Sequence, residues 1–149
     1  MNSDATWIVQ AFFDSYRLHD VDAMVSCCSE LAEFHYIPFE VWGKQRVLRG
    51  DGKVRTIGKV LWTGLIQSFP DLTNEVQTLV GDESGNVAVE ATLSGTQARV
   101  WGTIDNLGKR FTVRHLFRFR VNTEGLIESI TAYWDSAEFQ RQLGRVEID

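Results

Sequence analysis

Cysteine and histidine are scarce in this sequence, and their positions argue against the simplest metal sites. The chain has two cysteines, Cys27 and Cys28, and three histidines, His19, His35 and His115. No pair of them has the Cys-x-x-Cys or His-x-x-x-His spacing of a structural zinc site. The adjacent cysteines fall in an expected helix, where neighbouring side chains point about 100° apart and cannot easily form a disulfide. We therefore expect no bound metal and two cysteines that serve as small core residues.

Long apolar runs and an excess of positive charge are also missing. No window approaches the roughly 18 apolar residues that span a bilayer. The first residues, MNSDATWIVQAFF, lack the basic segment and apolar run of a signal peptide, so we expect a cytoplasmic protein with no membrane partner. The formal net charge is −5, which argues against nucleic acid as a partner because phosphate binding requires clustered lysine and arginine.

The composition that is present is typical of one globular domain. The chain has 149 residues, of which 44% are hydrophobic and 23% are charged, and these values lie near the averages for globular proteins. A chain of this length buries roughly two thirds of its unfolded surface on folding, so it needs no disulfide or metal for stability. We expect a single domain over residues 1–149, without linkers or repeats.

Helical periodicity dominates the first half of the chain. Apolar residues recur at steps of three or four, Asp20 is a candidate N-cap, and Pro70 ends the last helical pattern. A brief strand and a glycine-punctuated, irregular connection separate the second helix from the third. The predicted helices lie within residues 3–20, 20–31 and 53–69, the strand covers 32–38, and the connection covers 39–52.

The apolar period changes to two after the third helix. Four stretches of alternating apolar and polar residues are separated by turns that contain glycine and asparagine. They cover residues 72–81, 86–100, 108–121 and 125–134, and a short helix over 135–144 follows. Helices collected before a run of strands predict an α+β domain, in which an antiparallel sheet curves around the helices and encloses a pocket.

Four short segments carry a resemblance to a known family: SFPDL (68–72), LSGTQ (93–97), GKR (108–110) and AYWDSAEFQRQLG (132–144). With the order of the elements, they resemble the SnoaL-like polyketide cyclases of the nuclear transport factor 2-like superfamily. The resemblance implies a cone-shaped α+β fold, with three N-terminal helices packed on a curved antiparallel or mixed sheet. It also implies a homodimer and a deep pocket that needs no cofactor. Members of the superfamily include cyclases, isomerases, hydrolases, dehydratases and binding modules, so the fold does not determine the reaction.

One histidine, His115, lies on the apolar face of the predicted strand RFTVRHLFRFRV (110–121). A lone histidine on such a face is more often a core residue with a satisfied hydrogen bond than a catalyst. The resemblance favours catalysis, because SnoaL-type cyclases carry an acid/base aspartate in the strand after the Gly-Lys-Arg turn and His115 matches that position. We therefore predict that neutral His115 is a general base.

Glu90 and Thr92 belong to the preceding predicted strand. The register match to the family directs both toward the pocket, where Glu90 would orient His115 or act as an acid. The alternative is an exposed Glu90 that pairs with an arginine, since a strand with valine and leucine on one face normally turns its polar residues to solvent. The Asp-Arg-Asp set of limonene epoxide hydrolase, a relative, has no counterpart here, so epoxide opening by that mechanism is disfavoured.

Aromatic side chains supply the remaining candidate site residues. Tyr36 or Tyr16 would donate a hydrogen bond to a developing oxyanion, or alternatively to a backbone carbonyl in the core. The many flat side chains suit a polycyclic or aromatic ligand, although they are also good core material. Besides Tyr16 and Thr92, the side chains expected to contact the ligand are Trp42, Trp62, Phe117 and Trp134.

Together these residues predict a cofactor-independent acid/base enzyme that cyclises or isomerises a hydrophobic natural-product intermediate of polyketide or terpenoid type. His115 would be the base, Glu90 would orient it or act as the acid, and Tyr36 or Tyr16 would stabilise the oxyanion. One alternative is a hydrolase or dehydratase on the same scaffold, in which His115 activates water. The other is a module that binds a small ligand or dimerises without chemistry.

Overall fold

The fold was obtained as a computed structural model, which describes residues 3–39 and 50–145. Its helices are α1 (Ser3–Arg17), α2 (Val21–Ser26), α3 (Lys59–Ser68), which follows a π-helical turn η1 (Val54–Gly58), and α4 (Ser136–Gln142). Its strands are β1 (Cys28–Phe39), β2 (Gly50–Lys53), β3 (Thr73–Gly81), β4 (Asn86–Thr96), β5 (Arg110–Val121) and β6 (Ile127–Asp135). None of the described helices is both long and apolar enough to cross a membrane.

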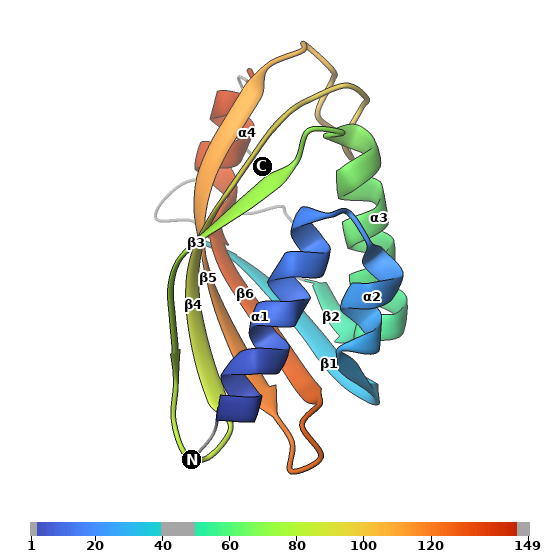
Figure 1. Cartoon of the computed structure of the whole chain (residues 1–149). Helices are drawn as coiled ribbons and strands as arrows, with labels where there is room; N and C mark the ends of the chain where they lie inside the picture. Colours follow the sequence, from blue (N-terminus) through green and yellow to red (C-terminus); the bar gives the residue numbers. More distant parts are fainter. Residues whose placement is uncertain (1–2, 40–49, 146–149) are drawn as a thin grey trace.

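The six strands form one mixed sheet in the order β2-β1-β6-β5-β4-β3. Strands β3 to β6 form an antiparallel meander, as the apolar period of two predicts, whereas β1 runs parallel to β6. Figure 1 shows α1, α2 and α3 on one face of this curved sheet. The sheet is open, with β2 and β3 at its edges. The predicted α+β fold with three N-terminal helices on a curved mixed sheet is confirmed.

The core lies between α1 and the helix-covered face of the sheet. Val9, Phe12 and Phe13 of α1 are at most 1% exposed, and the two phenylalanine rings pack edge-on against Phe119 of β5, with centroids 5.4 and 5.6 Å apart. Alternate residues of β4 and β5 complete this layer, because successive side chains of a strand point to opposite faces. They are Val87, Val89, Ala91, Leu93, Phe111, Val113, Phe117, Phe119 and Val121, all buried.

The structure corrects two expectations for the first half of the chain. Helix α2 ends at Ser26 and β1 begins at Cys28, although the helical pattern extends to residue 31. Leu31, the last apolar residue of the predicted helix, is consequently 74% exposed. Pairing with β6, a strand far along the chain, outweighs the local helical spacing here. Residues 50–53 likewise form β2 against β1, where the end of an irregular connection and the first residue of the third helix were expected.

Three of the segments that carry the family resemblance meet where α3, β4 and β5 come together. Asp71 accepts a hydrogen bond from the backbone N–H of Thr96 at 2.6 Å, and its carboxylate lies 3.4 Å from the guanidinium of Arg110. These contacts, the Thr96 bond foremost, lower the pKa of Asp71. Gly95 allows the close approach, since a Cβ there would lie 3.1 Å from Phe69. The shared segments therefore hold the framework of the fold together.

Candidate functional site

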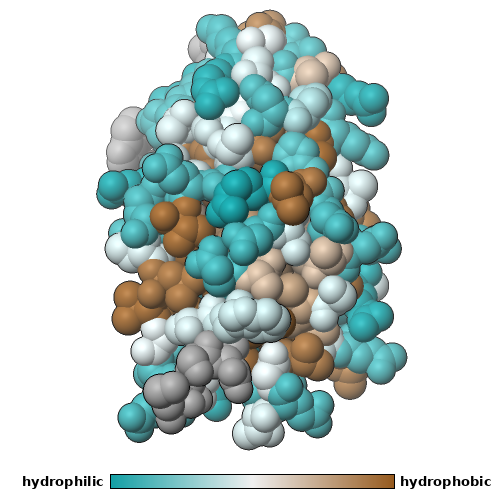
Figure 2. All heavy atoms as spheres, viewed as in Figure 1, coloured by the Kyte–Doolittle hydropathy of each residue, from teal (hydrophilic) through white to brown (hydrophobic). Residues whose placement is uncertain are grey.

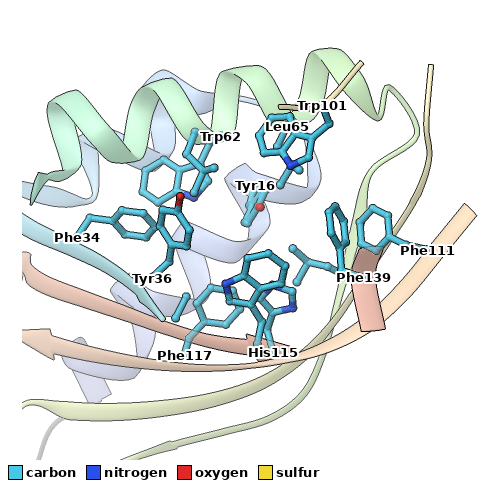
Figure 3. Close-up of a pocket in the computed structure, with 14 residues that line it drawn as sticks. Tyr16, Phe34, Tyr36, Trp62, Leu65, Trp101, Phe111, His115, Phe117 and Phe139 are labelled. Carbon is cyan, nitrogen blue, oxygen red and sulfur yellow. The ribbon is translucent and has the colours of Figure 1, made fainter. Parts of the chain in front are cut away.

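A pocket lined by apolar side chains lies between α3 and the concave face of the sheet (Figure 3). Its cavity volume is about 130 Å³, comparable to the roughly 150 Å³ of an engineered apolar cavity that binds benzene, and the pocket is partly open to solvent. The pocket expected from the curved sheet is therefore present. Its lining consists of Tyr16, Phe34, Tyr36, Leu61, Trp62, Leu65, Leu93, Trp101, Phe111, His115, Phe117, Ala132, Trp134 and Phe139.

Small residues on the sheet make room for the aromatic rings above it. Tyr36 of β1 lies between Gly50 of β2 and Ala132 of β6 in the register of the sheet. A Cβ atom at Gly50 would overlap the Tyr36 ring. Ala132 also lies beside Phe117 of β5, so one methyl group separates two large rings. This alternation of small and large side chains leaves space over the sheet that a ligand can enter.

His115 lies on the sheet side of the pocket, as its place in the apolar stripe of β5 predicts (Figure 3). Its ring stacks with those of Trp134 and Phe117, with centroid distances of 5.7 and 5.5 Å and interplanar angles of 4° and 16°. Its Nδ1 atom lies 3.4 Å from the carbonyl oxygen of Val113. Because a carbonyl only accepts, this contact favours the tautomer with the proton on Nδ1 and the lone pair on Nε2.

Burial lowers the pKa of His115 from 6.5 to about 4, because apolar surroundings disfavour the charged imidazolium. The hydrogen bond to the Val113 carbonyl acts in the opposite direction and is the smaller effect. The imidazole is therefore neutral at neutral pH and available to accept a proton. A proton that it accepts in this environment is held weakly and is readily passed on.

Tyr16 and Tyr36 bring hydroxyl groups to the pocket. Tyr16 projects from α1 and is buried, whereas Tyr36 projects from β1 and is half-buried. Burial raises the pKa of both phenols, so both keep their protons at neutral pH and can donate hydrogen bonds. Figure 3 shows both side chains directed into the space between α3 and the sheet, above His115. They supply the two hydroxyl groups of a largely apolar lining.

Glu90 does not line the pocket, so the predicted orientation of its side chain is wrong. It is exposed on the outer face of β4, where its carboxylate accepts a hydrogen bond from the Thr78 hydroxyl at 3.1 Å. Thr92 lies on the same outer face and does not line the pocket either. The inner positions of β4 are taken by Ala91 and Leu93, which are buried, and strand alternation turns their neighbours outward.

The other candidates within the described residues come together. The side chains that line the pocket with His115, as expected, are Tyr16, Tyr36, Trp62, Phe117 and Trp134. Trp42 lies outside the described residues. Sequence reasoning missed Phe111, although it shares the apolar stripe of His115, and Phe139 of α4, whose ring centroid lies 5.4 Å from that of Trp134. The alternating pattern of β5 was sufficient to predict the position of Phe111. The position of Phe139 depends instead on how α4 packs in the folded protein.

The polar groups of the pocket are few and uncharged. Within the described residues no Asp, Glu, Lys or Arg side chain lines it. In that part of the chain, too, no three His, Cys, Asp or Glu side chains are grouped so that they could hold a metal ion. The lining offers aromatic faces, indole N–H groups, two hydroxyls and one neutral imidazole. These groups suit a flat, uncharged molecule that carries oxygen substituents.

Solved structures with the same fold cover nearly the whole chain. AclR from Streptomyces galilaeus, provisionally named a hydroxylase, has a TM-score of 0.78 at 16% identity, over 98% of this chain and 99% of that chain. IdmH from Streptomyces antibioticus, provisionally named a polyketide cyclase, has a TM-score of 0.75 at 20% identity, over 94% and 98%. SalBIII, an epoxide hydrolase/cyclase-like enzyme in pyran ring formation in the polyether salinomycin, has a TM-score of 0.67 at 21% identity, over 90% and 92%.

These identities show a common fold and do not transfer a reaction. A search of curated proteins finds no match. The family assignment comes from the sequence itself, since the profile of the SnoaL-like domain matches residues 9–130. That match runs from within α1 to the first residues of β6 and includes His115. The chain therefore belongs to the SnoaL-like domain family.

Proposed function

We propose that this protein is a cofactor-independent acid/base enzyme that cyclises or isomerises an uncharged, hydrophobic intermediate of polyketide or terpenoid type. The observation that carries the proposal is the position of His115, a neutral imidazole in the wall of an otherwise aromatic and aliphatic pocket. The pocket has room for a ring-sized part of a molecule and is partly open to solvent. The names of IdmH and SalBIII support cyclisation of polyketide-like molecules as the class of reaction.

In the proposed reaction, Nε2 of His115 removes a proton from a carbon next to a carbonyl group of the ligand. The hydroxyl of Tyr16 or Tyr36 donates a hydrogen bond to the enolate oxygen that forms. In a cyclisation, the enolate carbon bonds to a second carbonyl carbon, and the imidazolium returns its proton to the new alkoxide. In an isomerisation, the proton returns to a different carbon. No co-reactant is consumed, and the low pKa of His115 favours the return of the proton.

Two other functions would use the same pocket. In a hydrolase or dehydratase, His115 would activate water, and incorporation of oxygen from labelled solvent into the product would reveal hydrolysis. A module that only binds ligands would need no proton-transfer group. Within the described residues, the ring of His115 makes one hydrogen-bond contact, with the Val113 carbonyl at 3.4 Å. A long single contact supports a catalytic histidine over one fully engaged in structure.

Hydrogen exchange into a simple ketone tests the proposed proton transfer without knowledge of the natural substrate. The probe is 1-tetralone, a bicyclic aryl ketone, in deuterated buffer, with loss of the α-hydrogen signal followed by NMR. We expect the wild-type protein to accelerate exchange and His115→Ala to lower the accelerated rate by about 100- to 10,000-fold. A wild-type protein that binds 1-tetralone but exchanges it no faster than His115→Ala would contradict the proposal.

A second histidine provides the matched control for this experiment. His35 lies on β1 outside the pocket, and its Nδ1 atom is 2.6 Å from the Asp51 carboxylate. His35→Gln removes one histidine from the protein, as His115→Ala does, but leaves the pocket unchanged. We expect the exchange rate of this variant to equal that of the wild-type protein.

A further inference from the structure

The segment between β4 and β5, residues 97–109, forms an arch that is attached to the end of α3. The backbone N–H of Ala98 donates to the carbonyl of Ser68 at 2.7 Å, and the N–H of Gln97 donates to the carbonyl of Lys109 at 2.9 Å. Two further backbone hydrogen bonds, at 3.1 and 2.8 Å, link the arch residues Trp101 and Ile104 to each other. The 97–109 arch is thus held at both of its ends and across its middle.

Gln97 fixes the inside of the 97–109 arch. Its side chain is 2% exposed, and its Nε2 donates to the carbonyl oxygens of Arg99 and Ile104 at 3.0 and 3.1 Å. Buried amide hydrogen bonds of this kind restrict the backbone, because breaking them would leave polar groups unpaired in the interior. The position of the residues between them, including Trp101, is therefore defined by the arch itself.

Trp101 projects from the arch onto α3 at a glycine. A Cβ atom at Gly64 would lie 3.3 Å from Cζ3 of the Trp101 ring, closer than ordinary packing allows. Glycine in a helix interior costs about 0.5–1 kcal/mol of stability relative to alanine. The residue that is unfavourable for the helix, Gly64, therefore stands at the point where the Trp101 ring approaches it. The ring also packs edge-on against Phe69, with centroids 6.4 Å apart. Trp101 is therefore held between a helix and a core ring.

Trp101 lies toward one end of the pocket, on the side of α3. Figure 3 shows Phe34 and Tyr36 at one end of the ligand space and Trp101, Phe139 and Phe111 toward the other, with Trp101 on the side of α3 and His115 on the sheet. Building on the proposed function, we propose that Trp101 determines the length of the ligand that the pocket accepts. A molecule with more fused rings than the space between these ends allows would collide with the Trp101 indole, which the arch and Gly64 hold in place.

The proposal is tested by comparing a short and a long aromatic ligand. The probes are 2-naphthol, with two fused rings, and 1-hydroxypyrene, with four, and the anisotropy of their own fluorescence reports binding. We expect Trp101→Ala to lower the ratio of the 1-hydroxypyrene Kd to the 2-naphthol Kd by at least about tenfold, since the vacated space admits the longer ligand. Trp101→Phe, which shortens the side chain but keeps a ring, should lower the ratio by a smaller factor.

A neighbouring residue of the arch serves as the matched control. Val100 is 59% exposed and does not line the pocket, so Val100→Ala should leave the ratio of the two dissociation constants unchanged. If both ligands bind the wild-type protein and neither Trp101 variant changes the ratio, Trp101 does not set the length and this inference fails alone. If neither ligand binds the wild-type protein, the proposed function fails and the inference fails with it.

Discussion

His115 places an ionisable group where packing favours an apolar side chain. Every other inward position of β5 is occupied by phenylalanine or valine, and the imidazole stacks on Trp134 and Phe117 as a further flat ring. Natural sequences depart from local packing rules mainly at functional sites. The departure at His115 therefore agrees with a role in proton transfer, and it has a consequence for stability.

We predict that His115 makes the folded protein less stable in acid. The pKa is about 4 in the folded state and 6.5 for an unperturbed histidine. Between these two pH values the unfolded chain binds more protons than the folded one, so stability falls as the pH is lowered from about 6.5 to about 4. The full difference corresponds to roughly 3 kcal/mol of unfolding free energy. Near neutral pH and above, the effect is absent.

Urea unfolding of the wild-type protein and of His115→Gln measures this effect. The free energy of unfolding is determined near neutral pH and again near pH 4 for both proteins. Tyr16 and Tyr36, the other titratable groups of the pocket, keep their protons at both pH values because burial raises their pKa. We expect a smaller loss of stability for His115→Gln. An equal loss in the two proteins would show that His115 is not held neutral by burial.

The sequence allowed the side of His115 to be predicted but not the side of Glu90. The face of β5 could be read from its unbroken alternation, which leaves a single choice for His115. For Glu90 the register match to the family predicts the pocket face, whereas alternation within β4 predicts the outer face. The structure agrees with the alternation. A register transferred between distant relatives can slip by one residue, and such a slip exchanges the two faces of a strand.

At the scale of elements, edge strand β2 determines where Tyr36 lies. We predict that Gly50→Ala displaces the Tyr36 ring, because the added Cβ would overlap it. Overpacking of this kind costs about 1–3 kcal/mol, and the displaced ring would also change the shape of the pocket. Urea unfolding and the affinity for 2-naphthol measure the two effects. Lys53→Ala, at an exposed position of the same strand, is the control. A Gly50→Ala protein with unchanged stability and affinity would contradict this account.

Elements whose partners are near in sequence were predicted well, and elements with distant partners were not. The meander from β3 to β6 pairs consecutive strands, so the alternating pattern and the turns between its strands are sufficient to predict it. Strand β1 pairs with β6, about a hundred residues later, and among the described strands β2 pairs with β1 alone. The sequence around Cys28 gives no indication of these distant partners, and the local spacing of its apolar residues indicates a helix.

At the scale of the whole molecule, the segments that carry the family resemblance contain none of the groups proposed for proton transfer. Asp71, Gly95 and Arg110 connect α3, β4 and β5 and line no part of the pocket. His115 and Tyr16 do line it. The segments supply Leu93, Ala132, Trp134 and Phe139 to the pocket lining, but they do not contain the histidine and tyrosines of the proposed reaction. The family fold therefore does not identify the reactive residues, and the composition of the pocket is the better guide to them.

Self-association stays a prediction at this scale, implied by the resemblance to the SnoaL-like cyclases. Figure 2 shows that the apolar groups on the helix-bearing face are separated by hydrophilic ones, so this face offers no broad apolar surface. We expect a homodimer whose contact uses another face. Light scattering after gel filtration should give twice the chain mass of 16.9 kDa. The mass of a single chain at micromolar concentration would show that the protein is a monomer.

The claim that neutral His115 moves a proton inside the pocket is tested most directly by the pH dependence of α-hydrogen exchange in 1-tetralone. Because burial lowers the pKa of His115 to about 4, the account predicts an exchange rate that is constant through neutral pH and falls only as the pH approaches about 4. His115→Gln should abolish the accelerated exchange at every pH. A rate that already falls near pH 6.5, the ordinary value for histidine, or a profile unchanged in His115→Gln, would contradict the account.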